Sequence, residues 1–160
     1  MSSVVTDADL ARFAYDEARL LDEKRFDEWY ELFTDEGIYW IPLIRGQPDG
    51  INHTSLFYDD RLLLRVRIER LKSPRSFSQH PPSFCQHVLQ QPAVERQETS
   101  DCWIVRTPFV YLEAQRDEQI VLAGVSWLHV AELDGRLRLR LKKVELLNCD
   151  AALPSIQLFL

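Results

Sequence analysis

Residues 118–147 read EQIVLAGVSWLHVAELDGRLRLRLKKVELL, and this stretch predicts a long antiparallel hairpin. Its two halves, 118–133 and 136–147, are both rich in apolar residues at strand-like spacing. Between them lies Asp134-Gly135, a pair that accepts the positive φ angles of a tight hairpin turn. The stretch therefore predicts that the fold is built on an antiparallel sheet.

The second half of this hairpin contains a change of parity. Leucines alternate with arginines over residues 137–141, as expected for a strand with one buried face. Val144 and Leu146 fall on the opposite parity. We expect a bulge near Lys142-Lys143, because one inserted residue returns both apolar sets to the core.

Two further strand candidates precede the hairpin, at residues 84–95 and 101–113. Pro92 indicates that the C-terminal end of the first candidate lies at a sheet edge or in a bulge, because proline has no backbone N–H to donate to a neighbouring strand. Strands that follow one another with short connections favour an antiparallel meander.

The start of the chain has helical spacing. Thr6 can cap a helix whose first turn carries acidic residues, the charge that the helix dipole favours there. Apolar residues then recur on one face, at Leu10, Phe13, Ala14, Ala18 and Leu21. A second, short helix is expected to bring together Phe26, Trp29, Tyr30 and Phe33. We expect Gly37 to end it and residues 38–41 to form a short strand.

Residues 56–75, LFYDDRLLLRVRIERLKSPR, fit two patterns. Alternate residues are apolar in the middle of the stretch, as in a strand, but Leu64, Ile68 and Leu71 also form a helical stripe. We interpret the stretch as a helix ended by Pro74, because acidic residues open it and basic residues close it. Helices followed by a meander indicate the class α+β, in a single domain over residues 1–160.

Charge and composition exclude several classes of function. The chain of 160 residues has a net charge of −6, which argues against nucleic acid as a partner, since phosphate binding needs a basic surface. Its start shows no signal peptide, and its longest apolar run, residues 38–44, is far shorter than the roughly 20 residues of a membrane span. Cys85, Cys102 and Cys149 are widely spaced, and we expect reduced thiols in a cytoplasmic protein.

The stretch SPRSFSQHPPSFCQH, which ends at His87, holds residue types found in metal sites. His80, Cys85 and His87 are suitable ligands by type. However, two prolines keep His80 apart, and a strand would present only Cys85 and His87 on one face. Further ligands would have to come from elsewhere, such as His53 or His129, and so no metal site is expected. The chain also has no G-x-S-x-G, P-loop or G-x-G-x-x-G motif, so no catalytic or cofactor-binding residue is assigned.

Acid–base chemistry is the alternative function. A group of helices on a curved sheet can enclose a pocket, in which a buried Asp or His with a shifted pKa would suit proton transfer. The side chains that could line it are Tyr15, Tyr39, Tyr58, His87 and Tyr111, with Asp16 or Asp59 nearby. The simpler interpretation, which we favour, is that these aromatic side chains fill the core.

Basic residues gather between Arg61 and Arg75, in a chain that is acidic overall. Arginine is the residue of choice for forked pairing at protein interfaces. The Pro-rich segment that follows is expected to be a stiff, extended arm that loses little entropy on docking. Helix and arm together predict a surface that grips another protein. The residues predicted for it are Arg61, Arg70, Arg75, Gln79, Pro81, Pro82 and His87.

Three stretches resemble the small, or beta, subunit of aromatic-ring-hydroxylating dioxygenases. The middle one, residues 58–89, has an Asp-Asp-Arg opening, a basic helix, an S-P-R exit, and then S-Q-x-P-P-S with a following histidine. The opening at 14–42 and the apolar tail at 146–160 are also similar to that family. The chain departs from the common pattern at Phe84-Cys85, where a polar or basic residue is more usual, and at residues 90–92.

This resemblance implies a fold, a partner and an activity. The fold would be the cystatin-like, or nuclear-transport-factor-like, cone, with N-terminal helices packed on a curved antiparallel sheet. The chain would be a mainly structural subunit of a bacterial enzyme, commonly with three large and three small subunits. The large, or alpha, subunit would hold the Rieske iron–sulfur cluster and the mononuclear iron, and would add dioxygen to an aromatic ring. The alternative on the same fold is a stand-alone dehydratase or isomerase.

Overall fold

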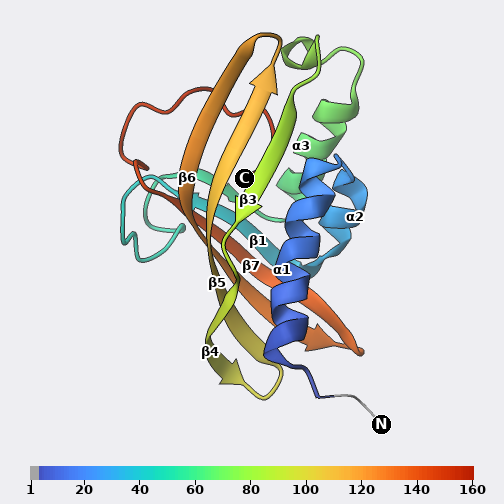
Figure 1. Cartoon of the computed structure of the whole chain (residues 1–160), viewed down its shortest axis with the longest axis vertical. Helices are drawn as coiled ribbons and strands as arrows, with labels where there is room; N and C mark the ends of the chain where they lie inside the picture. Colours follow the sequence, from blue (N-terminus) through green and yellow to red (C-terminus); the bar gives the residue numbers. More distant parts are fainter. Residues whose placement is uncertain (1–3) are drawn as a thin grey trace.

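The computed structural model describes residues 4–160 (Figure 1). The helices are α1 (Asp7–Asp22), α2 (Phe26–Glu31) and α3 (Arg61–Lys72), with a 3-10 turn, η1, at Phe77–Gln79. The strands are β1 (Phe33–Pro42), β2 (Ser55–Asp59), β3 (Phe84–Leu89), β4 (Ala93–Thr99), β5 (Cys102–Gln115), β6 (Glu118–Leu133) and β7 (Arg136–Leu146). The class is α+β, as the sequence predicted.

One seven-stranded sheet is the base of the fold. Its order is β2-β1-β7-β6-β5-β3, and β4 follows β3 along the same edge of β5. Neighbouring strands are antiparallel except β1 and β7, which are parallel. The predicted hairpin joins β6 to β7, and its turn has positive φ angles at Asp134 (53°) and Gly135 (74°).

The three helices lie on one side of the curved sheet (Figure 1). Thr6 caps α1 in a capping box with Asp9, and the Asp60 side chain caps α3 by accepting from the Leu63 N–H at 3.0 Å. Buried apolar residues of each helix meet the inner face of the sheet, and they include Leu10, Ala14, Leu21, Trp29, Leu64 and Ile68. No helix among residues 4–160 is long and apolar enough to cross a membrane.

The C-terminal segment completes this core. Phe159 packs against Trp29, with ring centroids 4.7 Å apart, and Leu158 and Leu160 are buried beside it. The Glu113 carboxylate accepts from the Leu158 N–H at 3.0 Å. The inner face of the sheet is therefore covered from both ends of the chain.

Strand β1 begins earlier than the sequence predicted. Gly37 does not end a helix but lies inside the strand, where the pairing with β7 is irregular: Phe33 pairs with Leu139, and Ile38 with Leu141. A Cβ atom at position 37 would lie 2.9 Å from the Cβ of Phe33. The irregular backbone therefore needs glycine here.

Two other boundaries also differ. The helix predicted over 56–75 is confirmed for residues 61–72, but its first residues belong to strand β2, because Asp60 caps the helix after them. The strand predicted over 84–95 is divided into β3 and β4, and Pro92 lies in the break.

The bulge predicted in the last strand lies at Arg140 rather than at Lys142-Lys143. His129 pairs with Leu141 and Val130 pairs with Leu139, so Arg140 is the extra residue. Lys142, and not Leu141, is consequently turned toward the core. A charged side chain thus lies on the inner face of the sheet.

Candidate functional site

Most of the predicted basic cluster is used inside the molecule. Arg61 donates to a backbone carbonyl oxygen of β1 at 2.6 Å and lies over the Tyr30 ring. Arg65 pairs with the Asp27 carboxylate at 2.9 Å, and Lys72 pairs with the same carboxylate at 2.5 Å. These contacts attach α3 to α2 and to the sheet, so these side chains have an internal role.

Arg70 and Arg75 are different. Both are exposed, and neither makes an ion pair within residues 4–160. Arg70 lines a hollow of about 270 Å³ together with Ser76 and Ser78 of the following loop. These two guanidinium groups are therefore free to meet a carboxylate on another molecule.

The Pro-rich segment is a compact loop, and the expectation of a stiff, extended arm is wrong. The chain turns at η1, and the peptide bond between His80 and Pro81 is cis. Gln115 of β5 donates to the carbonyl oxygens of Ser78 at 2.6 Å and of Pro81 at 2.8 Å. Hydrogen bonds to the neighbouring strand therefore fold the loop back onto the sheet.

This loop still presents an exposed surface. Pro81 and Pro82 are exposed, and the Phe77 side chain at its tip is 86% exposed. Gln79, in contrast, turns inward and accepts from the Ser83 N–H at 3.2 Å. Of the residues predicted in this loop, the two prolines can touch a partner directly, whereas Gln79 shapes the loop.

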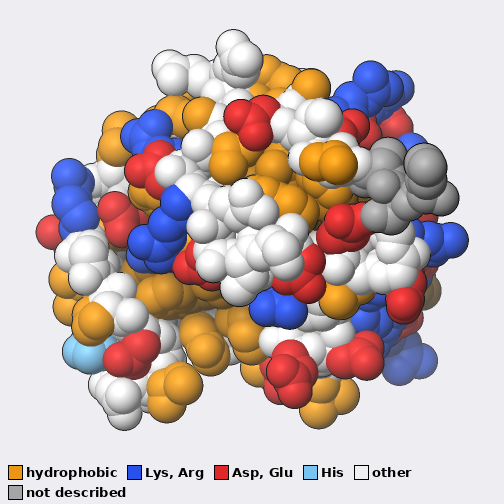
Figure 2. Space-filling view, turned by 90° about the horizontal axis from the view of Figure 1, so that it is seen from below, with side chains coloured by type: hydrophobic (Ala, Val, Ile, Leu, Met, Phe, Trp, Pro, Cys, Tyr) orange, Lys and Arg blue, Asp and Glu red, His pale blue; other side chains and the backbone are white. Residues whose placement is uncertain are grey.

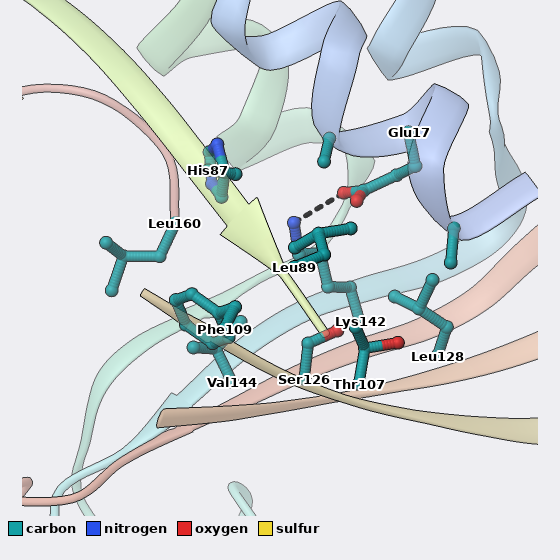
Figure 3. Close-up of a pocket in the computed structure, with 12 residues that line it drawn as sticks. Glu17, His87, Leu89, Thr107, Phe109, Ser126, Leu128, Lys142, Val144 and Leu160 are labelled. Atoms are coloured by element: carbon teal, nitrogen blue, oxygen red, sulfur yellow. Dashed lines mark hydrogen bonds and ion pairs between the residues drawn. The ribbon is translucent and has the colours of Figure 1, made fainter. Parts of the chain in front are cut away.

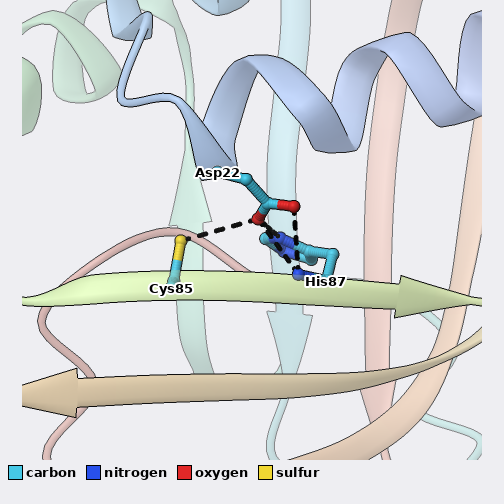
Figure 4. A group of neighbouring side chains, drawn as sticks. All are labelled: Asp22, Cys85 and His87. Carbon is cyan, nitrogen blue, oxygen red and sulfur yellow. Dashed lines mark hydrogen bonds and ion pairs between the residues drawn. The ribbon is translucent and has the colours of Figure 1, made fainter.

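His87 lies inside the molecule and joins β3 to the end of α1 (Figure 4). The Asp22 carboxylate accepts from the backbone N–H of His87 at 3.0 Å, and the His87 ring atom Nδ1 lies 2.6 Å from Asp22 Oδ1. Because His87 is buried, it cannot touch a partner directly. It can support the predicted docking surface only from inside, by holding β3 against α1.

The outer face of the sheet, opposite the helices, carries an apolar patch. Val88 pairs with Val110 across β3 and β5, and Leu112 pairs with Val121 across β5 and β6. Val88 is 53% and Val121 is 60% exposed. At one end of the molecule, seen from below in Figure 2, hydrophobic side chains also line a hollow in the surface. Contiguous apolar surface of this kind is typical of interaction sites.

An interior cavity lies between α1 and the inner face of the sheet (Figure 3). Its polar lining comes from α1 and four strands and consists of Glu17, His87, Thr107, Ser126 and Lys142. About 10 Å³ is open to the centre of a water molecule, which is room for about one water. The cavity is too small for an aromatic substrate.

A buried ion pair forms one wall of this cavity. Lys142 Nζ donates to Glu17 Oε1, and the two side chains are 3% and 4% exposed. The Trp29 indole N–H also donates to Glu17 Oε1, at 2.9 Å. The pair is thus neutralised and hydrogen-bonded, as buried charges require. Across the cavity, His87 Nε2 and Thr107 Oγ1 are buried without a hydrogen-bond partner among residues 4–160.

The structure does not gather the tyrosines of the predicted pocket around this cavity. Tyr39 and Tyr111 lie in the core, and burial raises the pKa of both hydroxyls. The Tyr39 hydroxyl oxygen accepts from the Leu160 N–H at 2.9 Å, and the Tyr111 hydroxyl donates to Glu113 at 2.7 Å. Both tyrosines therefore serve the packing of the C-terminal segment.

The other members of that predicted pocket lie elsewhere. Tyr15 is exposed on α1, beside the exposed Asp16. Tyr58 packs against Trp40 outside the core cluster, and Asp59 is paired with Arg67. Only His87 of the predicted set lines the cavity.

Sequence reasoning missed the other polar residues of the cavity. Glu17 could have been found, because it lies seven residues after Leu10 on the apolar stripe of α1, where a charged residue needs a partner. Lys142 could not have been found, because the face of the sheet to which its side chain points depends on the position of the bulge.

Comparison with known proteins gives one consistent family. The sequence profile described as "Ring hydroxylating beta subunit" matches residues 16–151. The small subunit of 2-halobenzoate 1,2-dioxygenase from Burkholderia cepacia is 35% identical over 96 residues, which span 56% of this chain and 58% of that protein. The small oxygenase component of the p-cumate 2,3-dioxygenase system of Pseudomonas putida is 25% identical over 155 residues, or 96% of this chain and 85% of that protein.

Solved structures agree with this result. The beta subunit of benzoate 1,2-dioxygenase from Burkholderia mallei has a TM-score of 0.75 at 27% identity, over 92% of this chain and 94% of that chain. A protein assigned as a scytalone dehydratase, from Novosphingobium aromaticivorans, has a TM-score of 0.63 at 14% identity, over 86% of this chain and 80% of that chain. The second likeness concerns the fold alone, which is the nuclear-transport-factor-like cone.

Proposed function

The chain belongs to the family of ring-hydroxylating dioxygenase beta subunits, and from this premise we propose that it is a mainly structural small subunit of a bacterial aromatic-ring-hydroxylating dioxygenase. Its partner is the large subunit, and the assembly holds three copies of each chain. The large subunit binds and oxidises the aromatic compound. The small subunit contributes surfaces that hold the assembly together.

The closed interior is the observation that carries a structural role. The cavity between α1 and the sheet admits about one water, so the cone has no room for an aromatic ring. The C-terminal segment occupies the space beside it, with Phe159 and Leu160 buried. A chain whose interior is filled by its own residues acts through its surface.

The residues present do not fit a Rieske cluster. Such a cluster needs two cysteines and two histidines close together. Within residues 4–160, the group of neighbouring metal-ligand types contains one cysteine and one histidine, Cys85 and His87, with Asp22. The Rieske cluster and the mononuclear iron therefore belong to the large subunit in this proposal.

Two surfaces suit two kinds of neighbour. The free guanidinium groups of Arg70 and Arg75, with the exposed loop at Pro81 and Pro82, fit an acidic surface of the large subunit. The apolar outer face of the sheet fits another subunit of the same assembly, because burying it removes exposed valines from water. Arg61 supports the first surface from within.

Charge reversal tests the first surface. The tagged small subunit is co-expressed with its large subunit, with and without the substitutions Arg70→Glu and Arg75→Glu. We expect at least a tenfold loss of the co-purified large subunit, since two attractive pairs become repulsive. The matched control reverses two other exposed arginines, Arg12→Glu and Arg136→Glu. Unchanged co-purification of the first variant contradicts this surface.

One observation favours a second candidate function, acid–base catalysis by the isolated chain. Asp22 orients the His87 ring through Nδ1, and Nε2 meets the cavity without a partner among residues 4–160. That arrangement is typical of a general base. The candidate is weaker, because the cavity admits no substrate. It predicts turnover of a small carbonyl or hydroxyl compound by the isolated chain, lost on His87→Ala.

A further inference from the structure

Three metal-ligand atoms of different chemistry meet where α1 ends against β3 (Figure 4). Cys85 and His87 are two residues apart on β3, so their side chains share its inner face. Asp22, the last residue of α1, faces both of them. The ligand atoms of the three residues all lie within 4.8 Å of one another. The strand supplies two ligands, and the helix supplies the third.

We propose that Asp22, Cys85 and His87 form a binding site for a divalent metal ion that accepts sulfur ligands, of which Zn²⁺ is the type. The ion is bound by Cys85 Sγ, His87 Nδ1 and one carboxylate oxygen of Asp22. Water takes the fourth position of a tetrahedron. Zinc sites with three protein ligands and one water use this mixture of sulfur, nitrogen and oxygen donors.

The distances suit such an ion. Zinc lies about 2.0–2.3 Å from its ligands, which places two tetrahedral ligands roughly 3.3–3.7 Å apart. Cys85 Sγ and Asp22 Oδ1 are already 3.7 Å apart. His87 Nδ1 and Asp22 Oδ1 are 2.6 Å apart, so the ion has to separate them by less than about 1 Å. A small rotation of the Asp22 carboxylate supplies this movement.

The fourth position has access to solvent. Asp22 and His87 also line a surface groove of about 670 Å³ between α1 and β3, with Arg19 and Gln86. Water can therefore reach the ion from this groove. The groove therefore gives the ion an entry path beside Asp22 and His87.

The protons can be accounted for. On binding, the Cys85 thiol gives its proton to solvent, and the thiolate sulfur bonds to the metal. The hydrogen of His87 moves from Nδ1 to Nε2, which leaves the Nδ1 lone pair free. Nε2 has no hydrogen-bond partner among residues 4–160, so no bond is broken there. Thr107 Oγ1, which also lacks a partner among residues 4–160, lines the same cavity and could accept from the new N–H through one water.

Charge and location indicate what the ion would do. A thiolate and a carboxylate balance the two positive charges of the metal, so the half-buried site becomes neutral. The ion would link the end of α1 to β3, the strand that follows the Pro-rich loop. If the metal binds the folded chain but not the unfolded chain, the free energy of unfolding should rise with the logarithm of the free metal concentration.

Cobalt is the probe that reports each ligand. Metal-free chain, prepared with a chelator, is titrated with Co²⁺ while its visible and near-ultraviolet absorbance is recorded. The proposal predicts the strong visible bands of tetrahedral cobalt and a thiolate-to-cobalt charge-transfer band, both removed by an excess of Zn²⁺. Cys85→Ser should abolish the charge-transfer band, and Asp22→Asn should weaken cobalt binding by more than about tenfold.

The matched control is Cys102→Ser, which removes another buried thiol and should leave both bands unchanged. A wild-type chain without a charge-transfer band overturns the proposal, as does a band that Cys85→Ser retains. If Cys85→Ser does not fold, as judged by circular dichroism, the wild-type and Cys102→Ser spectra decide. A second readout is the melting temperature, which Zn²⁺ should raise in the wild type and leave unchanged in Asp22→Asn.

Discussion

The two faces of the β-sheet place polar and apolar groups in opposite ways. On the inner face, under the helices, the charged pair of Glu17 and Lys142 is fully buried. On the outer face, Val88 and Val121 are more than half exposed. In most soluble domains, charged side chains lie on the exposed surface and large apolar side chains lie in the core. The inner face is covered by the chain's own helices and C-terminal segment, and the outer face is the one that our proposal assigns to a neighbouring subunit.

The buried pair is tolerated because it is paired and hydrogen-bonded. Glu17 accepts from both Lys142 and the Trp29 indole, so neither charge is isolated. The pair also links α1, which carries Glu17, to β7, which carries Lys142. The apolar side chains of the outer face would gain stability from burial in an assembly.

Breaking the inner pair should have the largest effect. Lys142→Met leaves the Glu17 carboxylate buried without its cation, which we expect to cost about 3–5 kcal/mol in the free energy of unfolding. Urea unfolding followed by tryptophan fluorescence measures this cost. The variant should fold poorly with or without the large subunit.

The double variant Glu17→Gln with Lys142→Met is the control for that prediction. It removes both charges and keeps an acceptor for the Trp29 indole, so most of the lost stability should return. If the double variant is no more stable than Lys142→Met alone, the two charges do not act as a pair, and the description of the inner face is wrong.

Charging the outer face should leave the isolated chain intact and weaken assembly. Val88→Lys with Val121→Lys places two ammonium groups on exposed positions, which should change the free energy of unfolding by no more than about 0.5 kcal/mol each. An interface would have to bury these charges at a cost of at least about 2 kcal/mol, or roughly thirtyfold in affinity. Urea unfolding and analytical ultracentrifugation of the complex measure the two quantities. Normal assembly would show that this face is not an interface.

High pH should also destabilise the inner face. Burial, with a contribution from the Asp22 carboxylate, raises the pKa of the Cys85 thiol from 9.0 to about 12. Between those two values the unfolded chain loses a proton that the folded chain keeps, so stability falls as the pH rises through this range.

Cys85→Ala isolates this contribution from that of Tyr39 and Tyr111, whose pKa values burial also raises. In the presence of a chelator, the variant should lose less stability than the wild type between about pH 8 and about pH 11. An equal loss in both proteins, measured by urea unfolding, would assign the alkaline instability to other groups.

The sequence predicted the fold well where the signal is local. The Asp134-Gly135 turn, the long strands on either side and the helix closed by Pro74 can be read from neighbouring residues. The start of β1 could not be read in this way, because its irregular ladder depends on β7, about a hundred residues away in the chain. The direction of Lys142 depends on the same long-range pairing.

The candidate sites show the same limit. The basic cluster was visible in the sequence, but only the structure shows that Arg61 is used internally while Arg70 and Arg75 are free. Cys85 and His87 were recognised as a ligand pair without a third member. Asp22, more than 60 residues earlier, is brought beside them by the packing of α1 on β3.

The most direct test of the central claim is gentle affinity purification of the tagged chain from its native cells, followed by mass spectrometry and absorbance spectroscopy of the eluate. We expect a larger protein in equal amount, with the visible absorbance of a Rieske cluster, and a native mass that fits three copies of each chain. A chain that elutes alone, folded and colourless would contradict its assignment as a dioxygenase subunit.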